Sequence, residues 1–132
     1  MPKVVNISEA ASIAFHAMIL IVRSNKPLNA TKIADRIHSS KHHVAKVLLR
    51  LAKVDIIDSV RGPSGGFFMK SKPEDVTFLS IYESIEGKIN YTKCEMDKPL
   101  CSFDKCIYNN IIEKMTFDFI DYLQSQKLID YI

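Results

Sequence analysis

The chain has 132 residues, of which 47% are hydrophobic and 25% charged, with a formal net charge of +3 and three cysteines. This is the length of one domain and the composition of an ordinary globular protein, and no low-complexity tract or internal repeat appears. An odd number of cysteines, without a recognisable signal peptide, argues against a disulfide-stabilised secreted fold. The longest apolar stretch, Ala11 to Val22, is too short to span a bilayer. We therefore expect a cytoplasmic protein.

Charge is divided unevenly along the chain. Residues 1–72 contain 12 Lys and Arg against 4 Asp and Glu, a net charge of +8, whereas residues 73–132 contain 6 against 11, a net charge of −5. The first part therefore has the positive field expected of a surface that binds phosphate groups. A solvated basic face that binds nothing is the alternative, and charge alone does not exclude it.

Three helices are predicted in the first half, over 7–23, 30–37 and 41–53. Asn29 and Ser40 are good N-caps for the second and third of them. The third helix has one apolar stripe at i, i+3, i+4 and i+7 spacing. This stripe comprises Val44, Val47, Leu48 and Leu51. Two short helices joined by a tight connection, the second with a basic outer face, are typical of a helix-turn-helix.

A β-hairpin is predicted directly after the third helix. Two short β-prone runs, 56–60 and 67–70, flank the turn Arg61-Gly62-Pro63-Ser64-Gly65-Gly66. A hairpin in this position is typical of a wing, and glycines let its backbone approach a sugar–phosphate edge closely. A glycine-rich turn is weak evidence by itself, but its place after the helix pair favours a wing strongly.

The basic helix and the wing together predict binding to double-stranded DNA. Their Lys and Arg side chains are expected to contact phosphates or bases. Their Ser and His side chains are expected to read bases or to position the protein on the DNA. The expected DNA-binding residues are Ser40, Lys41, His42, His43, Lys46, Arg50, Arg61 and Ser64. For His42 and His43, a solvated helix face is the alternative.

The second half predicts two more helices. One covers 74–86, starts near Thr77 and ends at Gly87. The other covers 107–124 and has an apolar stripe that a small winged-helix domain cannot cover alone. This stripe comprises Tyr108, Ile111, Ile112, Met115, Phe119, Tyr122 and Leu123. A second copy of the chain is the expected cover, so the sequence predicts a homodimer.

Cys94, Cys101 and Cys106 lie within thirteen residues, in a segment without a regular period. Closely spaced thiolates bind zinc, Cu(I) or an iron–sulfur cluster, and three of them need a fourth ligand. Three unrelated thiols are the alternative, because free cysteine is often buried. The segment is rich in Lys and Asp, however, which is not the pattern of a core. Ligand type alone does not separate zinc from a cluster.

The wing and the cysteines together resemble the Rrf2 family of bacterial transcriptional regulators. The resemblance rests on Val60-Arg61-Gly62-Pro63-Ser64-Gly65-Gly66-Phe67, the three cysteines and the long final helix, and extends from about Ile7 to Leu123. It implies a mainly α-helical winged helix-turn-helix fold with a small β-hairpin wing and a long C-terminal dimerisation helix.

The resemblance also implies a function. It implies a homodimeric transcriptional repressor or activator whose DNA affinity is controlled by a [2Fe–2S] or [4Fe–4S] cluster on the three cysteines. Such a regulator would sense redox state, nitric oxide or iron–sulfur status. The alternative is a zinc-containing or cluster-free winged-helix regulator that responds to a protein partner or to thiol oxidation.

The fourth ligand varies within the family that the chain resembles. In one type it is a histidine three residues after the last cysteine, and the matching residue here, Asn109, is a poor ligand. In other types it comes from the first helix of the partner subunit, at positions that match Ser12 or His16. Because Glu9, Ser12 and His16 share one helical face, we predict His16 as the fourth ligand and Glu9 as the fallback. The alternative for His16 is a core histidine bonded to a backbone carbonyl.

The two parts of the chain are expected to form one integrated domain. Residues 1–72 are the predicted winged helix-turn-helix region, and residues 73–132 the predicted cluster-binding loop and dimerisation helices. The sequence shows no Ser/His/Asp set, no paired catalytic carboxylates and no nucleotide-binding loop. We therefore expect no enzyme, no small-molecule substrate and no membrane, with DNA and a second copy of the chain as partners.

Overall fold

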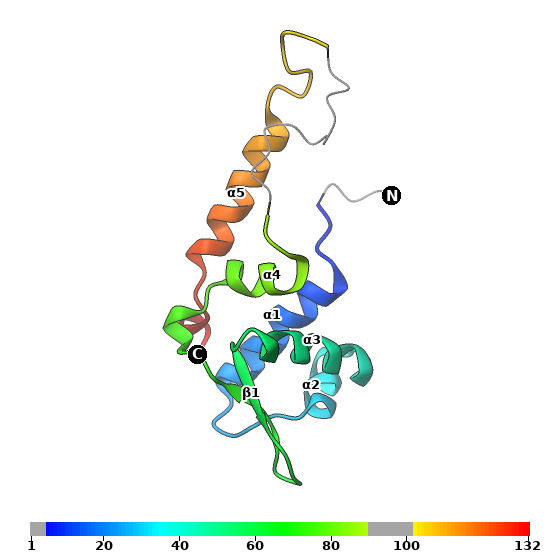
Figure 1. Cartoon of the computed structure of the whole chain (residues 1–132), viewed down its shortest axis with the longest axis vertical. Helices are drawn as coiled ribbons and strands as arrows, with labels where there is room; N and C mark the ends of the chain where they lie inside the picture. The colour runs from blue at the N-terminus through cyan, green and yellow to red at the C-terminus, as the bar shows by residue number, and fades with distance from the viewer. Residues whose placement is uncertain (1–4, 90–101) are drawn as a thin grey trace.

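The computed structural model describes residues 5–89 and 102–132. Its helices and strands are α1 (Glu9–Arg23), α2 (Ala30–Ile37), α3 (Lys41–Lys53), β1 (Ile57–Val60), β2 (Gly66–Met69), α4 (Phe78–Glu86) and α5 (Ile111–Ser125), with short 3₁₀ turns η1 (Pro73–Asp75) and η2 (Leu128–Tyr131). In Figure 1 the first four helices form one body, the hairpin projects below it, and α5 extends along the long axis. The predicted winged helix-turn-helix fold with a long final helix is confirmed.

Polar side chains fix where the helices begin. Ser8, Asn29 and Ser40 each accept a hydrogen bond from the backbone N–H three residues later, at 2.8–3.1 Å. Thr77 caps α4 in the same way, and the Ser80 hydroxyl oxygen accepts a hydrogen bond from the Thr77 backbone N–H. Each cap satisfies a backbone donor that the helix leaves free, which stabilises the helix by about 1 kcal/mol. The second and third helices therefore have the predicted bounds, and α1 begins two residues later than predicted.

The turn between α2 and α3 is tight although it lacks glycine. His38 adopts the left-handed conformation there, with φ 56° and ψ 45°. The N–H of Ser39 then donates to the carbonyl of Ala34 at 3.1 Å and closes the end of α2. A left-handed residue other than glycine costs about 1–2 kcal/mol. That cost is offset by the packing of α3 against α1 and α2.

The wing is anchored to the loop that precedes α2. The N–H of Leu28 donates to the carbonyl of Phe67 at 3.0 Å, and the N–H of Phe67 donates to the carbonyl of Leu28 at 2.7 Å. Gly66, the first residue of β2, makes this approach possible, because a Cβ built there would lie 2.4 Å from the Leu28 carbonyl carbon. Its φ of +149° also favours glycine. The backbone pair fixes the wing beside the start of the helix-turn-helix.

Gly66→Ala is expected to lower the free energy of unfolding by at least about 2 kcal/mol more than Gly62→Ala. Both positions have a positive φ, but Gly62, at +113°, has nothing within 4 Å of an added Cβ. Gly62→Ala therefore adds backbone strain alone, whereas Gly66→Ala adds a clash with the Leu28 backbone. Urea unfolding of the two variants measures the difference. Equal losses would show that the close approach of Gly66 to Leu28 is not needed.

One hydrophobic core joins the two halves of the chain, with α1 at its centre. Helices α2, α3 and α4 and the turn η2 all pack against α1. Fully buried side chains come from elements that are far apart in sequence, and the largest include Met18, Ile33, Leu48, Leu51, Ile81 and Leu128. In the described part of the chain, no helix has the length and apolar character needed to cross a membrane.

Helix α5 is covered along only part of its length. Ile120 and Leu123 near its C-terminal end are buried, and the Phe119 ring packs edge-on against Tyr82 with centroids 5.4 Å apart. At the other end, Ile111 is 45% exposed. The helix also begins four residues later than predicted, because residues 109 and 110 both have a positive φ and interrupt it. The predicted apolar stripe is therefore covered only in part, because Tyr108, Ile111 and Tyr122 are exposed while Leu123 is buried.

Candidate DNA interface and cysteine site

The outer face of α3 carries the exposed basic side chains that the sequence predicted. Lys41, His42 and Lys46 are exposed. Among the residues that the structure describes, their side chains make no hydrogen bond or ion pair. Leu49 follows these residues in the sequence of α3 and is 62% exposed. Sequence reasoning missed Leu49, although its place outside the apolar stripe of α3 was a signal that it faces outward.

Three of the expected DNA-binding residues have partners within the protein. The Ser40 hydroxyl caps α3. The Nδ1 atom of His43 lies 3.4 Å from a carboxylate oxygen of Glu9 in α1. One guanidinium nitrogen of Arg50 donates to the carbonyl of Ile85 in α4, at 2.6 Å. These three side chains therefore help to hold α3: the sequence predicted this role for Ser40 but did not indicate it for His43 or Arg50.

Arg61 and Ser64 lie in the turn of the wing, between β1 and β2. Both are exposed, and within residues 5–89 and 102–132 neither side chain has a hydrogen-bond or ion-pair partner. The strands pair antiparallel, with Val60 opposite Gly66 at the turn. The two side chains therefore lie in the turn of a hairpin that projects from the body of the protein (Figure 1).

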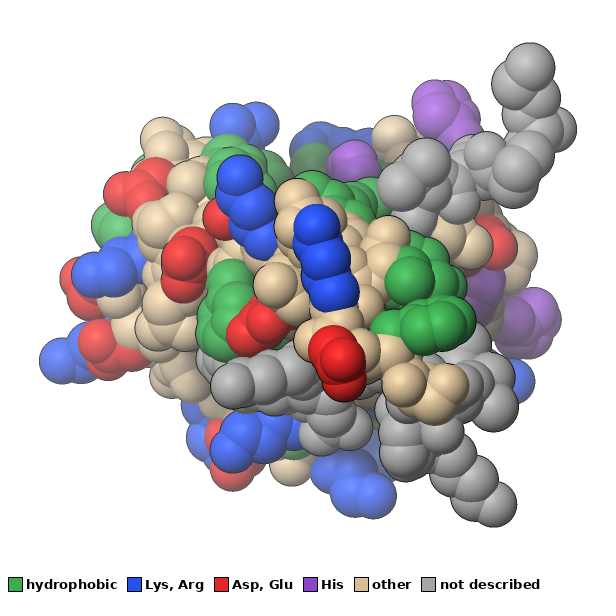
Figure 2. Space-filling view, turned by 90° about the horizontal axis from the view of Figure 1, so that it is seen from above, with side chains coloured by type: hydrophobic (Ala, Val, Ile, Leu, Met, Phe, Trp, Pro, Cys, Tyr) green, Lys and Arg blue, Asp and Glu red, His purple; other side chains and the backbone are tan. Residues whose placement is uncertain are grey.

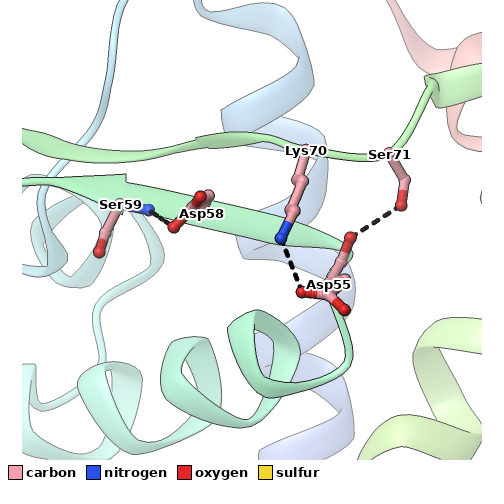
Figure 3. A network of polar contacts seen from close by, with 5 residues as sticks. All are labelled: Asp55, Asp58, Ser59, Lys70 and Ser71. Carbon is pink, nitrogen blue, oxygen red and sulfur yellow. Dashed lines mark hydrogen bonds and ion pairs between the residues drawn. The ribbon is translucent and has the colours of Figure 1, made fainter.

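A network of polar contacts stiffens the base of the wing (Figure 3). Asp55 follows α3 in the left-handed conformation, with φ 64°. Its carboxylate accepts a hydrogen bond from the Lys70 amine at 2.8 Å, and its carbonyl accepts one from the Ser71 hydroxyl at 2.9 Å. The hydrogen bond to Asp55 raises the pKa of the Lys70 amine. The end of β2 is thus tied to the connection between β1 and α3, the proposed recognition helix.

His16 is exposed on α1 and does not lie in the core. Its Nδ1 atom lies 2.6 Å from the backbone carbonyl oxygen of Ser12. Because a carbonyl oxygen only accepts hydrogen bonds, Nδ1 carries the hydrogen, and the lone pair of the neutral ring is on Nε2. Histidine ligands of metals commonly donate their other ring N–H to a carbonyl in this way. A bond to a backbone carbonyl is also what the alternative for His16 predicted, so its role as a ligand stays a prediction.

The predicted shared face of Glu9, Ser12 and His16 lines a hollow of about 420 Å³. The end of α2 and the α2–α3 turn also line it, with Arg36 and Ile37 from the helix and His38 and Ser39 from the turn. Among the described residues, Ser39 Oγ is the one buried side-chain polar atom without a hydrogen-bond partner. Figure 2 shows histidine side chains gathered at one side of the molecule. Sequence reasoning missed the residues of this turn, because their approach to α1 is a tertiary contact.

The cysteines are only partly described. Cys94 and Cys101 lie outside the described residues, whereas Cys106 is a free and exposed thiol. A hollow of about 590 Å³ is lined by Phe103, Lys105, Cys106, Ile107 and Asn109. It shares no residue with the hollow that His16 lines. In the part of the chain that the structure describes, no three His, Cys, Asp or Glu side chains are grouped to hold a metal ion.

The donor atoms present nevertheless fit a metal or cluster. The exposed thiol of Cys106 and the imidazole of the exposed His16 are donors that both zinc and iron–sulfur clusters accept. Asn109, three residues after Cys106, brings an amide, which is a weaker donor for such metals. The residue that would fill the fourth position therefore stays a prediction.

The family model for Rrf2, described as an iron-dependent transcriptional regulator, matches residues 7–132. The chain belongs to the Rrf2 family. The transcriptional regulator NsrR of Bacillus licheniformis is 28% identical to it over 111 residues, which cover 83% of this chain and 78% of that protein.

Solved structures support the same fold. CymR, the global cysteine regulator of B. subtilis, superposes with a TM-score of 0.78 at 20% identity, covering 96% of this chain and 95% of that one. T. potens IscR superposes with a TM-score of 0.76 at 22% identity, covering 96% and 85%. This Rrf2 protein is a DNA-binding transcriptional regulator and not an enzyme, as the sequence predicted.

Proposed function

We propose that this Rrf2 protein is a cytoplasmic homodimer, and a repressor, whose DNA affinity is set by an iron–sulfur cluster. Cys94, Cys101 and Cys106 of one subunit would hold the cluster, and His16 of the partner subunit would complete the site. The observation that carries the proposal is the orientation of His16, whose Nδ1–H bond to Ser12 leaves Nε2 for a ligand. Glu9 remains the fallback ligand.

Two further observations support this proposal. The family description names iron as the requirement for regulation. Among the described residues, the hollows that His16 and Cys106 line have no residue in common, and a donor from a second subunit is consistent with this. The cluster would supply a group whose bonds to the protein change with oxidation, nitrosylation or loss. His16 and the cysteines would then link two subunits in one state and release them in the other.

A cluster-free regulator is the second candidate. It would respond to thiol oxidation or to a protein partner, and the exposed thiol of Cys106 favours thiol oxidation. Zinc on the same residues is a further possibility, because three thiolates and one imidazole form an ordinary structural zinc site.

Metal analysis of protein purified without oxygen distinguishes these candidates. The proposal predicts a brown protein with broad visible absorption, and with iron and acid-labile sulfide in equal amounts. A colourless protein with one zinc per chain would make the site structural. A protein with neither metal, in which oxidant changes DNA binding, would favour the thiol mechanism. Sedimentation of the same sample measures whether it is a dimer.

We also propose which side chains contact DNA. Lys41, His42 and Lys46 of α3, with Arg61 and Ser64 of the wing, are exposed and have no competing partner among the described residues. We propose that the Lys and Arg side chains contact phosphates or bases. His42 and Ser64 would read bases or position the protein on the DNA. Leu49 adds an apolar side chain suited to a thymine methyl group.

Lys46→Ala and Arg61→Ala should each reduce the salt dependence of DNA binding. A lysine or arginine that neutralises one phosphate releases counterions, so each loss should lower the slope of log affinity against log salt by about 1. Lys114→Ala is the matched control, because it removes the same charge from the exposed face of α5. Fluorescence anisotropy with a labelled duplex gives the slopes. Unchanged slopes in both variants would show that α3 and the wing do not form the interface.

A further inference from the structure

The C-terminal end of α4 is a point where three parts of the protein meet. The carbonyl of Ile85, in the last turn of α4, accepts the hydrogen bond from Arg50 of the recognition helix α3. The carboxylate of Glu86, the next residue, accepts a hydrogen bond from the Ser8 hydroxyl at the start of α1. Cys94 follows Ile85 by nine residues. We call these two bonds the α4 junction.

Arg50 lies on the flank of α3, and although the residue is exposed, its guanidinium contacts α4. The buried stripe of this helix has its centre near Val47 and Leu51, and Lys46 lies on the opposite side. His43 and Arg50 are seven residues, or about two turns, apart on the same flank. Each contacts a different neighbour, since His43 lies against Glu9 of α1 and Arg50 bonds to α4. This flank is thus partly exposed, and each of its two side chains reaches one neighbouring helix.

The bond between Arg50 and Ile85 satisfies two needs at once. The last four carbonyls of a helix have no partner within the helix and carry partial negative charge. A guanidinium is always charged, and a hydrogen bond from it to a carbonyl is stronger than one between neutral groups. The contact is partly buried, which limits competition from water. A DNA phosphate would compete with the Ile85 carbonyl for the same side chain.

We propose that Arg50 is a positioning residue that couples the cysteine segment to the recognition helix through the α4 junction. A change in the segment after α4 reaches Ile85 along the backbone, and Arg50 transmits the displacement of this carbonyl to α3. The Ser8–Glu86 bond ties the same end of α4 to α1, the helix that carries His16. The inference rests on the proposed function in one respect: the signal that reaches Arg50 is a change in the cluster. The position of Arg50 itself does not depend on it.

DNA binding by the full-length protein, loaded and stripped of its cluster, tests the coupling. The probe is a duplex that the wild-type protein selects from a random-sequence pool, and the readout is the ratio of the two dissociation constants. For Arg50→Ala we expect this ratio to fall about fivefold or more towards one, the scale of ordinary allosteric coupling. The salt slope should stay at the wild-type value. Arg50→Lys, which keeps a charged donor, should restore part of the ratio.

Matched variants separate coupling from DNA contact. Lys46→Ala should weaken both forms equally and lower the salt slope by about 1. Lys53→Ala removes the same charge from the exposed last turn of α3 and should leave the ratio unchanged. If Arg50→Ala lowers the salt slope by about 1 and leaves the ratio at the wild-type value, Arg50 is a DNA contact and the proposal fails.

Hydrogen exchange tests the junction without any cluster. The N–H of Gly87 donates to the Glu83 carbonyl at 3.0 Å, and the N–H of Ile89 donates to the Glu83 carboxylate at 3.1 Å. In Arg50→Ala both amides should exchange about tenfold faster, because the end of α4 loses its tie. Unchanged exchange would overturn the coupling route. A wild-type protein without iron would instead overturn the proposed function, while the exchange and the salt slope would still decide the position of Arg50.

Discussion

Ile111→Glu is expected to convert the protein from dimers to monomers. Ile111 begins α5 and is 45% exposed in the single chain. An acidic residue at the first position of a helix is favourable for the helix itself, so the fold should survive the change. In a dimer with twofold symmetry two carboxylates would be buried in an apolar contact, each at a cost of several kcal/mol. The dissociation constant of the dimer should therefore rise at least about a hundredfold.

Gln124→Glu is the control for this change. It places the same side chain on α5 at an exposed position near the other end of the helix, where the neighbouring Leu123 is buried in the chain's own core. Analytical ultracentrifugation gives the masses of both variants, and far-UV circular dichroism shows whether they are folded. A folded Ile111→Glu dimer of unchanged affinity would place the interface elsewhere. DNA affinity should fall together with dimerisation, because two half-sites are then no longer bound by one molecule.

The fold was predictable where the signals are local. Ser40 and Asn29 are capping residues followed by apolar residues at helical spacing, and both signals depend only on neighbours in sequence. The bounds of α2 and α3 therefore agree with the prediction. The wing was predictable because Gly62, Gly65 and Gly66 allow few structures other than a turn between two β-prone runs.

The start of α5 and the conformation of the α2–α3 turn were harder to predict, because one residue type can adopt either of two backbone conformations. Asn109 and Asn110 are tolerated within a helix, but asparagine also adopts the left-handed conformation readily, and here both do so and delay the start of α5. His38 supplies the left-handed turn that glycine usually supplies. For His38, the packing of α2 and α3 against α1 and each other holds the turn, whereas Asn109 and Asn110 are exposed and follow the preference of asparagine.

In the candidate site, too, features with a local sequence signal were predictable and features that depend on tertiary contacts were not. The exposure of Lys46 and Arg61 followed from periodicity and from the turn. The partner of Arg50 did not, because Ile85 is 35 residues away in sequence and accepts the bond through its backbone. No side-chain pattern marks a carbonyl at a helix end as an acceptor. The hollow between His16 and the α2–α3 turn is likewise a product of tertiary packing.

Cys106→Ser is expected to abolish the cluster, whereas His16→Ala should leave a cluster that assembles but is labile. A serine hydroxyl is a much poorer donor than a thiolate for iron, so the loss of one of three cysteines removes the site. The loss of His16 leaves all three thiolates, with the fourth position open to Glu9, water or a small thiol. The cluster lifetime in air should then shorten by about tenfold or more.

His38→Asn is the matched control for His16→Ala. His38 lines the same hollow from the α2–α3 turn, and asparagine tolerates its left-handed backbone. The control should keep the wild-type absorption spectrum and lifetime, because its ring is not the one whose Nδ1 is bonded to Ser12. Both quantities are measured on anaerobic protein exposed to a fixed amount of air. An unaltered spectrum and lifetime in His16→Ala would remove this histidine from the ligand set. The position of Glu9 on the same hollow would then make Glu9→Gln the next variant to measure.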